Sequence, residues 1–443
     1  MRDTLRAQLW PVPTLGVVLA VAAGVGLPRL DARIQHEIPP WLTEYLFAGS
    51  ADAARTVLQA IAGSLISVTA LTFSLTVVTL QLASSQFSPR LLRTFTADRY
   101  VQTTLALFLA TFTYALTVLR TVRTGDDEQV VFVPHLSVTG AFLLALASVL
   151  GLVLFLSHLA REIRVETMMR SVHSAADHTI HRLLPEKDPA ARDSGTPPEP
   201  PADALPLPVG RSGFLTAVDE EALLEAAAEA DAVLLVDRLP GSSLIAGTPL
   251  GAAWPRTGEP FSPQTWTRLL RRTSEAVSTG AERTDAQDVT FGLRQLTDIV
   301  AKALSPGIND PTTAVHGLSH SSALVCDLAR RGLGPRLLRD DHHQVRVVLQ
   351  RPDLENLLDL AVAQPLRYGA AEPAVLARIL MLLRELAWTS TPEQHPPIVA
   401  VLARLRSTTA AQDFHAAERA RLTKLAQQVE QALAGRWTYD QMH

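Results

Sequence analysis

The segment between Arg55 and Arg90 contains no charged residue, yet it is rich in serine, threonine and glutamine. If it is helical, successive side chains advance by about 100° around the axis. On that basis the polar residues separate onto two roughly opposite faces. One face holds four threonines: Thr69, Thr72, Thr76 and Thr79. The other, which we call the polar stripe, holds Ser67, Ser74, Gln81 and Ser85, with Ser88 just beside it.

Two interpretations of these faces stay open. Small hydroxyl residues let helices approach closely, and their hydroxyls bond back to the carbonyl four residues earlier. That packing interpretation suffices for the threonine face. It suits the polar stripe less well, because Gln81 must place a whole amide in water or against a polar partner. The alternative is that several copies of the stripe line a water-filled path with uncharged hydroxyl and amide groups. A charge-coupled transporter is disfavoured, because no charged residue lies within the segment.

A proline closes this segment. Pro89 disfavours a helical conformation at Ser88, so we expect the helix to end or kink there. Arg90 and Arg93 would then lie at the cytoplasmic mouth of a path. They would act either as topology anchors or as a ring that meets anions.

A second polar region runs from Glu282 to Thr313. Its candidate ligand-sensing residues are Arg283, Asp288, Asp298, Asn309 and Asp310. One interpretation is a structural turn with helix caps and ion pairs, and the other is a ligand-sensing or ion-sensing site. The sequence shows no nucleophile–base pair and no phosphate-binding glycine loop, so we predict no catalytic residues and no enzyme.

Metal and cofactor binding are not predicted. His173, Asp177 and His181 recur every four residues on one helix face, a spacing that can bind a divalent ion. One helix supplies three ligands at most and no fourth is evident, so we expect exposed, mutually satisfied side chains. The single cysteine, Cys326, excludes an intramolecular disulfide framework.

The distribution of charge shows which elements must position these residues. Residues 1–160 hold only 10 basic and 9 acidic residues, whereas residues 161–443 hold the remaining 30 and 35. A bilayer core of about 30 Å requires about 20 apolar residues in a helix. Four uncharged windows meet that requirement. We predict spans near residues 9–27, 60–82, 101–119 and 138–157, within a transmembrane domain at residues 1–160.

Basic residues are concentrated on one side of these spans. Arginines precede the first span, occupy the loop between the second and third, and follow the fourth, whereas the opposite loops are balanced or acidic. The positive-inside rule therefore places both termini in the cytoplasm. A cleaved signal peptide is an alternative for the first span, but its apolar run continues past Ala20–Ala22 to Leu27, which favours a span.

The remaining chain is predicted to be cytosolic and mostly helical. We expect a helix at residues 161–184 that continues the last span, and a proline-rich linker at residues 185–212. A small α/β or β-rich module follows at residues 213–260, then a helical domain at residues 261–443. The predicted fold class is thus a membrane protein with a four-helix transmembrane region and a cytosolic α+β, mostly helical C-terminal region.

Two long motifs resemble a known family. The first is Leu71-Thr-Phe-Ser-Leu through Leu80-Gln-Leu-Ala-Ser-Ser-Gln-Phe-Ser-Pro-Arg90, and the second runs from Gln287-Asp through Phe291-Gly to Ala303-Leu-Ser-Pro-Gly-Ile-Asn-Asp-Pro311. Both resemble the bacterial predicted membrane proteins of domain-of-unknown-function family 2254. The resemblance covers almost the whole chain and implies a multi-pass protein of the bacterial inner membrane. It assigns no role to any residue.

The function that these features favour is a homo-oligomeric ion channel, or channel-like protein, with a cytosolic gating or sensing domain. The alternative is a membrane-anchored sensor or scaffold without a permeation path. The expected partners are the lipid bilayer, further copies of the chain and inorganic ions. Nucleic acid is not expected, because the net charge is only −4.

Overall fold

A computed structural model describes residues 10–34, 46–86, 99–123, 132–162, 164–186, 196–437 and 439. The chain divides after Thr167 into two compact units. We call them the membrane unit and the C-terminal unit.

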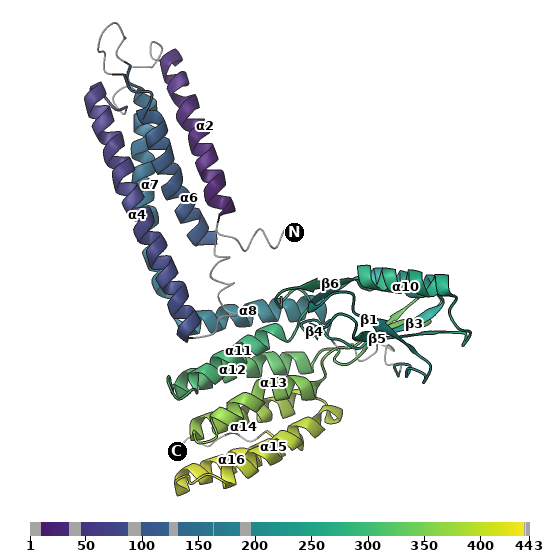
Figure 1. The fold of residues 1–443 in the computed structure, drawn as a ribbon. Helices are drawn as coiled ribbons and strands as arrows, with labels where there is room; N and C mark the ends of the chain where they lie inside the picture. The colour runs from purple at the N-terminus through teal and green to yellow at the C-terminus, as the bar shows by residue number, and fades with distance from the viewer. Residues whose placement is uncertain are drawn as a thin grey trace. The chain divides into compact units, whose positions relative to one another are not determined.

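Four long helices make up the described part of the membrane unit (Figure 1). They are α2 (Pro11–Ile34), α4 (Ala51–Gln86), α6 (Arg99–Leu119) and α7 (His135–Glu162). Each is long and apolar enough to cross a bilayer, which confirms the four predicted spans. Helix α6 contacts the other three, and it is the most deeply buried of the four.

The core of the membrane unit combines alanines with larger apolar side chains. Ala54 and Leu58 of α4 lie in one buried cluster with Tyr114 and Val118 of α6. Other large apolar side chains lie on the outside, including Phe142, which is 59% exposed. An apolar exterior around a tightly packed interior is what a lipid environment permits.

The last span does not run on as one helix. Helix α7 ends at Glu162, Arg164 lies outside any helix, and α8 (Val165–Leu183) then begins. The amide of Arg164 donates to the Arg161 carbonyl at 3.2 Å, a bond of the tighter i to i+3 type. The break coincides with a change of pattern, because α7 is apolar all round whereas α8 buries only one face. The single helix predicted at residues 161–184 is therefore corrected to a separate helix, α8.

The C-terminal unit contains two sheets. The five-stranded sheet has the order β1 (Leu205–Pro208), β5 (Pro249–Pro255), β3 (Ala232–Val236), β8 (Val345–Leu349) and β7 (Arg336–Arg339). Only the β3–β8 pair is parallel, with Val236 opposite Leu349. The three-stranded sheet has the order β4 (Ser243–Leu244), β2 (Gly213–Val218) and β6 (Val277–Gly280). Because β6, β7 and β8 come from residues after 260, the sheets extend beyond the predicted module at residues 213–260.

Part of the predicted linker is a strand. β1 carries Pro206 and Pro208 and pairs only with β5. Proline lacks the N–H that a second neighbour would need, so it is tolerated at the edge of a sheet. Of the linker predicted at residues 185–212, residues 187–195 lie outside the described residues.

The remaining helices either flank the sheets or stack on one another (Figure 1). They are α9 (Glu220–Glu229), α10 (Pro263–Glu275), α11 (Phe291–Ala303), α12 (Pro311–Ala329), α13 (Leu354–Tyr368), α14 (Pro373–Thr389), α15 (His395–Ala410) and α16 (Ala416–Leu433). Of these, α9 and α10 lie with the sheets. Asp219, Ser262 and Asp310 cap α9, α10 and α12, as their sequence positions indicate.

Candidate functional site

The two polar faces of α4 have different surroundings in the membrane unit. Thr69, Thr72, Thr76 and Thr79 are all buried, at 2–8% exposure. The hydroxyls of Thr69, Thr76 and Thr79 each donate to the carbonyl four residues earlier, at 2.6–2.9 Å. The threonine face therefore packs within the chain, and three of its four hydroxyls are satisfied by their own helix.

The polar stripe lies on the opposite, exposed side of α4. Ser67, Ser74 and Gln81 are exposed. The Ser67 hydroxyl donates to the Gly63 carbonyl at 3.2 Å. Within the described ranges, no hydrogen bond joins the side chain of Ser74 or Gln81 to another residue. The stripe is thus presented outward from the single chain instead of being sealed inside it.

Parts of the predicted path cannot be placed. The backbone of Ser85 belongs to α4, but its side chain lies outside the described residues, as do Ser88, Arg90 and Arg93.

The stripe belongs to a regularly spaced series of exposed positions on α4, most of which carry small residues. Exposed positions recur alternately three and four residues apart: Ala60, Gly63, Ser67, Ala70, Ser74, Val77 and Gln81. This 3–4 spacing is the pattern with which one helix packs along another. At Gly63 an added Cβ would meet no atom within 4 Å, so this chain leaves the space beside it open. The exposed face of α4 is suited to contact with another helix outside the chain.

The membrane unit also contains a buried carboxylate. Asp31 of α2 is 4% exposed and accepts hydrogen bonds from the backbone N–H groups of Leu136 and Ser137, at 3.0 and 2.9 Å. The Ser137 hydroxyl donates to it at 2.6 Å. Asp31 thereby satisfies the free N–H groups at the start of α7, where the helix dipole favours a negative charge.

The predicted ligand-sensing residues divide between the two ends of α11. Arg283 pairs with Asp288, whose other oxygen accepts from the Thr290 amide at 3.0 Å and from its hydroxyl at 2.6 Å. Helix α11 begins only after this turn, at Phe291. An added Cβ on Gly241, which has φ +87°, would clash with both members of the ion pair.

At the other end, Asn309 adopts a left-handed conformation and Asp310 caps α12. Thirteen residues of α11 separate the two ends, about 20 Å of helix. Asp298 is half-buried within α11 itself. The five residues therefore do not converge on one site, and of the five it is Asp288 that lines the cavity described next.

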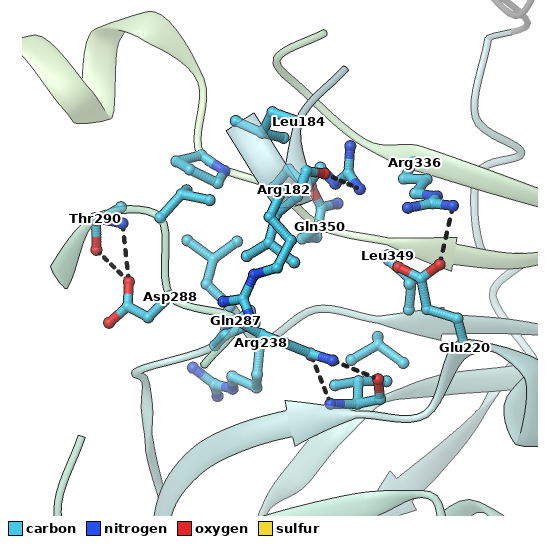
Figure 2. A pocket seen from close by; sticks show the side chains of 18 residues that line it. Arg182, Leu184, Glu220, Arg238, Gln287, Asp288, Thr290, Arg336, Leu349 and Gln350 are labelled. Carbon is cyan, nitrogen blue, oxygen red and sulfur yellow. Dashed lines mark hydrogen bonds and ion pairs between the residues drawn. The ribbon is translucent and has the colours of Figure 1, made fainter. Parts of the chain in front are cut away.

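That cavity has a volume of about 260 Å³ and lies in the C-terminal unit (Figure 2). Four arginines line it: Arg182, Arg238, Arg336 and Arg351. Its apolar lining includes Val236, Leu239 and Leu349. The Gln287 side chain closes one part by bonding to both backbone groups of Val218, at 2.8 and 3.1 Å. The cavity is small, close to the lower end of the range for ligand pockets, about 300–1,000 Å³.

A third group of polar side chains connects α8 and α12. Ligand atoms of Asp177, His181 and Asp327 lie within 4.8 Å of one another, so the tertiary structure adds Asp327 to the face predicted from α8. The His181 ring bonds to the Asp177 carbonyl, and Asp327 is paired with buried Arg331. Each of these three side chains already has a protein partner.

The family model described as "Predicted membrane protein (DUF2254)" matches residues 6–385. The chain belongs to this family. It is 38% identical over 385 residues to the uncharacterized protein Rv1290c of Mycobacterium tuberculosis, and equally to the uncharacterized protein Mb1321c of Mycobacterium bovis. Each alignment covers 87% of this chain and 73% of the relative. No solved structure matches it significantly.

The sequence interpretation of this DUF2254 protein did not predict the arginine-lined cavity. Arg182, Arg238 and Arg351 lie in three segments far apart in the chain, and each is an ordinary surface residue by its local pattern. A usable signal existed only at Arg238 and Arg351, because each follows a short run rich in valine and leucine that is typical of a strand, at residues 232–236 and 345–349. Ligands bind preferentially beyond the carboxyl ends of parallel strands.

Proposed function

We propose that copies of this membrane protein assemble around α4, and that the polar stripes of several copies surround a path for water and small inorganic ions. The C-terminal unit would regulate that path in response to a ligand. The observation that carries the proposal is the exposed position of Ser67, Ser74 and Gln81 on a membrane-spanning helix.

The argument is one of solvation. An amide transferred into an apolar medium without a hydrogen bond costs about 2–7 kcal/mol. Gln81 has no hydrogen-bond partner among the described residues, so its amide needs either water or a polar group from outside that part of the chain. Assembly of copies around the stripe supplies both, whereas a lone chain in lipid supplies neither at bilayer depth.

The chemistry of the lining defines what such a path would carry. The segment between Arg55 and Arg90 contains hydroxyl and amide groups but no charge. These groups replace part of an ion's hydration shell without binding it tightly, so we expect a permeation path and neither a proton relay nor catalysis. We place the protein in the bacterial inner membrane with both termini cytoplasmic, on the distribution of arginine in the loops.

A membrane-anchored sensor or scaffold is the second candidate. The 3–4 spacing of small residues on the exposed face favours it, because such a face can pack tightly and exclude water. Both candidates predict contact between copies of α4. They differ in whether water contacts the polar stripe in the assembled protein.

Thiol accessibility distinguishes them. In a Cys326→Ala background, which removes the single native cysteine, a cysteine is introduced separately at Ser67, Ser74 and Gln81. Matched variants carry it at Ile66 and Phe73, which are exposed but apolar. A wet path predicts that water-borne thiol reagents modify the stripe positions faster than the matched positions. Equal resistance at all five positions in a folded oligomer contradicts the channel and supports the scaffold.

Conductance is the direct measurement. The purified oligomer in planar bilayers should conduct, and Gln81→Leu or Ser74→Leu should reduce the current. Phe73→Leu, on the apolar side of the same helix, should leave it unchanged. A well-folded oligomer that carries no current in several salts would contradict the channel proposal.

A further inference from the structure

Arginine dominates the charge of the cavity in the C-terminal unit. Its lining contains two carboxylates, Glu220 and Asp288, and each is already engaged by an arginine. Glu220 pairs with Arg336 at 3.0 Å, as Figure 2 shows, and Asp288 pairs with Arg283. Among the described residues, Arg182, Arg238 and Arg351 form no ion pair. The cavity therefore presents an excess of positive charge.

Arg351 is the most informative of the three. It is half-buried, and its guanidinium donates one long hydrogen bond of 3.4 Å to the Leu183 carbonyl. Desolvation lowers the pKa of Arg351, the neighbouring charge of Arg336 lowers it further, and Glu220 opposes that shift. A partly desolvated guanidinium without its own carboxylate is costly unless an anion compensates it.

The backbone topology brings Arg238 and Arg351 to one edge. β3 and β8 are neighbouring parallel strands with Val236 opposite Leu349. Arg238 and Arg351 each follow two residues later, so both lie just beyond the carboxyl ends of these strands. That is the crevice in which open sheets with parallel strands bind ligands.

Arg182 reaches the same cavity from the last turn of α8 (Figure 2). One of its nitrogens donates to the Ala286 carbonyl at 2.9 Å, which fixes the guanidinium beside the loop at residues 286–290. A guanidinium carries five N–H donors, so this contact leaves most of them available. Three separate segments thus deliver three guanidinium groups to one small volume.

We propose that this cavity binds a small phosphate-bearing molecule, with Arg182, Arg238 and Arg351 holding the phosphate. Guanidinium groups match phosphate oxygens in pairs, which makes arginine the preferred residue for such recognition. The apolar lining from Val236, Leu239 and Leu349 provides room for a small uncharged part. Ligand binding at this cavity does not depend on the channel proposal. Only the idea that the bound ligand regulates conduction rests on the proposed function.

Binding is measured on the full chain in nanodiscs of zwitterionic lipid, by calorimetry with inorganic pyrophosphate. Arg351→Gln and Arg238→Gln should each weaken binding about tenfold or more, because hydrogen bonds to charged groups contribute about 1.5–3 kcal/mol. The control is Arg268→Gln on α10, which removes the same charge from an exposed position outside the cavity and should bind like the wild type.

Arg351→Lys keeps the positive charge, so it is less prone to misfold than Arg351→Gln and serves as a second test of the same position. It should also weaken binding, because an ammonium lacks the paired donors of a guanidinium.

Competition by anionic phospholipid in the nanodisc would identify a lipid headgroup as the source of the phosphate. If anionic phospholipid has no effect on binding, the ligand is a soluble molecule. Absence of pyrophosphate binding at millimolar concentration, or equal binding by the Arg351, Arg238 and Arg268 variants, overturns the site. Binding in a protein that does not conduct would refute only the channel.

Discussion

The membrane unit and the C-terminal unit both bury apolar side chains, but they differ in how many large apolar side chains they leave exposed. In the membrane unit large apolar residues such as Leu19, Phe142 and Leu150 are 59–60% exposed, while Thr72 and Thr111 are buried. In the C-terminal unit, leucines of α13 and α14 such as Leu357 and Leu382 are fully buried. The difference teaches that the surrounding solvent, and not polarity alone, decides which face of a helix turns inward.

The two units also satisfy buried polar groups differently. The membrane unit relies on single hydroxyls that bond to their own helix and on one carboxylate, Asp31, at a helix start. The C-terminal unit uses ion pairs, among them Arg331–Asp327 and Arg378–Glu385. Substitutions should therefore cost most where a charge is left alone and least where one hydroxyl is removed.

The largest effect is expected at Arg331. Its side chain is 3% exposed, pairs with Asp327 and donates to the Leu184 carbonyl at the end of α8, at 2.7 Å. Arg331→Ala should destabilise the C-terminal unit by about 2–4 kcal/mol, since it leaves the partly buried Asp327 without its charge partner and the Leu184 carbonyl without its donor. Denaturant unfolding of the full chain in detergent measures it. Arg330→Ala is the matched exposed control, and equal losses would contradict the comparison.

The second largest loss of stability is expected for substitution of Asp31. Asp31→Ala leaves the N–H groups of Leu136 and Ser137 without their acceptor. Each buried unsatisfied donor costs about 1–3 kcal/mol. Hydrogen exchange at residues 136 and 137 should accelerate, and the melting temperature in detergent should fall. Asp31→Asn, which retains an acceptor oxygen, should lose less; an equally large loss would mean that the charge matters more than the acceptor.

Asp310 tests whether a predicted sensing residue is structural. The Thr313 hydroxyl bonds to it at 2.6 Å and, with the Thr313 amide, lowers its pKa, while partial burial opposes that shift. Asp310→Ala should remove about 1 kcal/mol of helix-cap stabilisation. Because the pKa is depressed in the folded state, this contribution is present above the unfolded pKa of about 3.9 and is lost as the pH falls through the folded value. Unfolding measured between neutral and acidic pH should show the variant and the wild type converging.

The smallest effect is expected for a hydroxyl pair between two spans. Thr111 of α6 and Ser148 of α7 are both buried, and their hydroxyl oxygens lie 3.1 Å apart. Thr111→Val should cost only about 0.6 kcal/mol, the average for such bonds inside membranes. Thr103→Val, at an exposed position on α6, should cost nothing measurable. A loss at Thr111 as large as that at Arg331 would remove the distinction between the two units.

The sequence interpretation was accurate for features set by interactions between residues close in the chain, and it failed where residues farther apart interact. The four spans were predictable because each helix must by itself cross a hydrocarbon layer of fixed thickness. Caps such as Ser262 and Asp310 were predictable because they act within one turn. The start of α11 was not, because the bond from Arg283 to Asp288 reshapes the preceding turn.

The sequence by itself determined that this protein carries four membrane helices, and that α4 has one threonine face and one serine–glutamine face. Only the tertiary structure decided which of those faces is buried, since that depends on where α6 packs. It alone also brought Arg182, Arg238 and Arg351 to one cavity. The physical reason is that hydropathy and helix capping act along the chain, whereas the parallel pairing of β3 with β8 joins segments more than 100 residues apart.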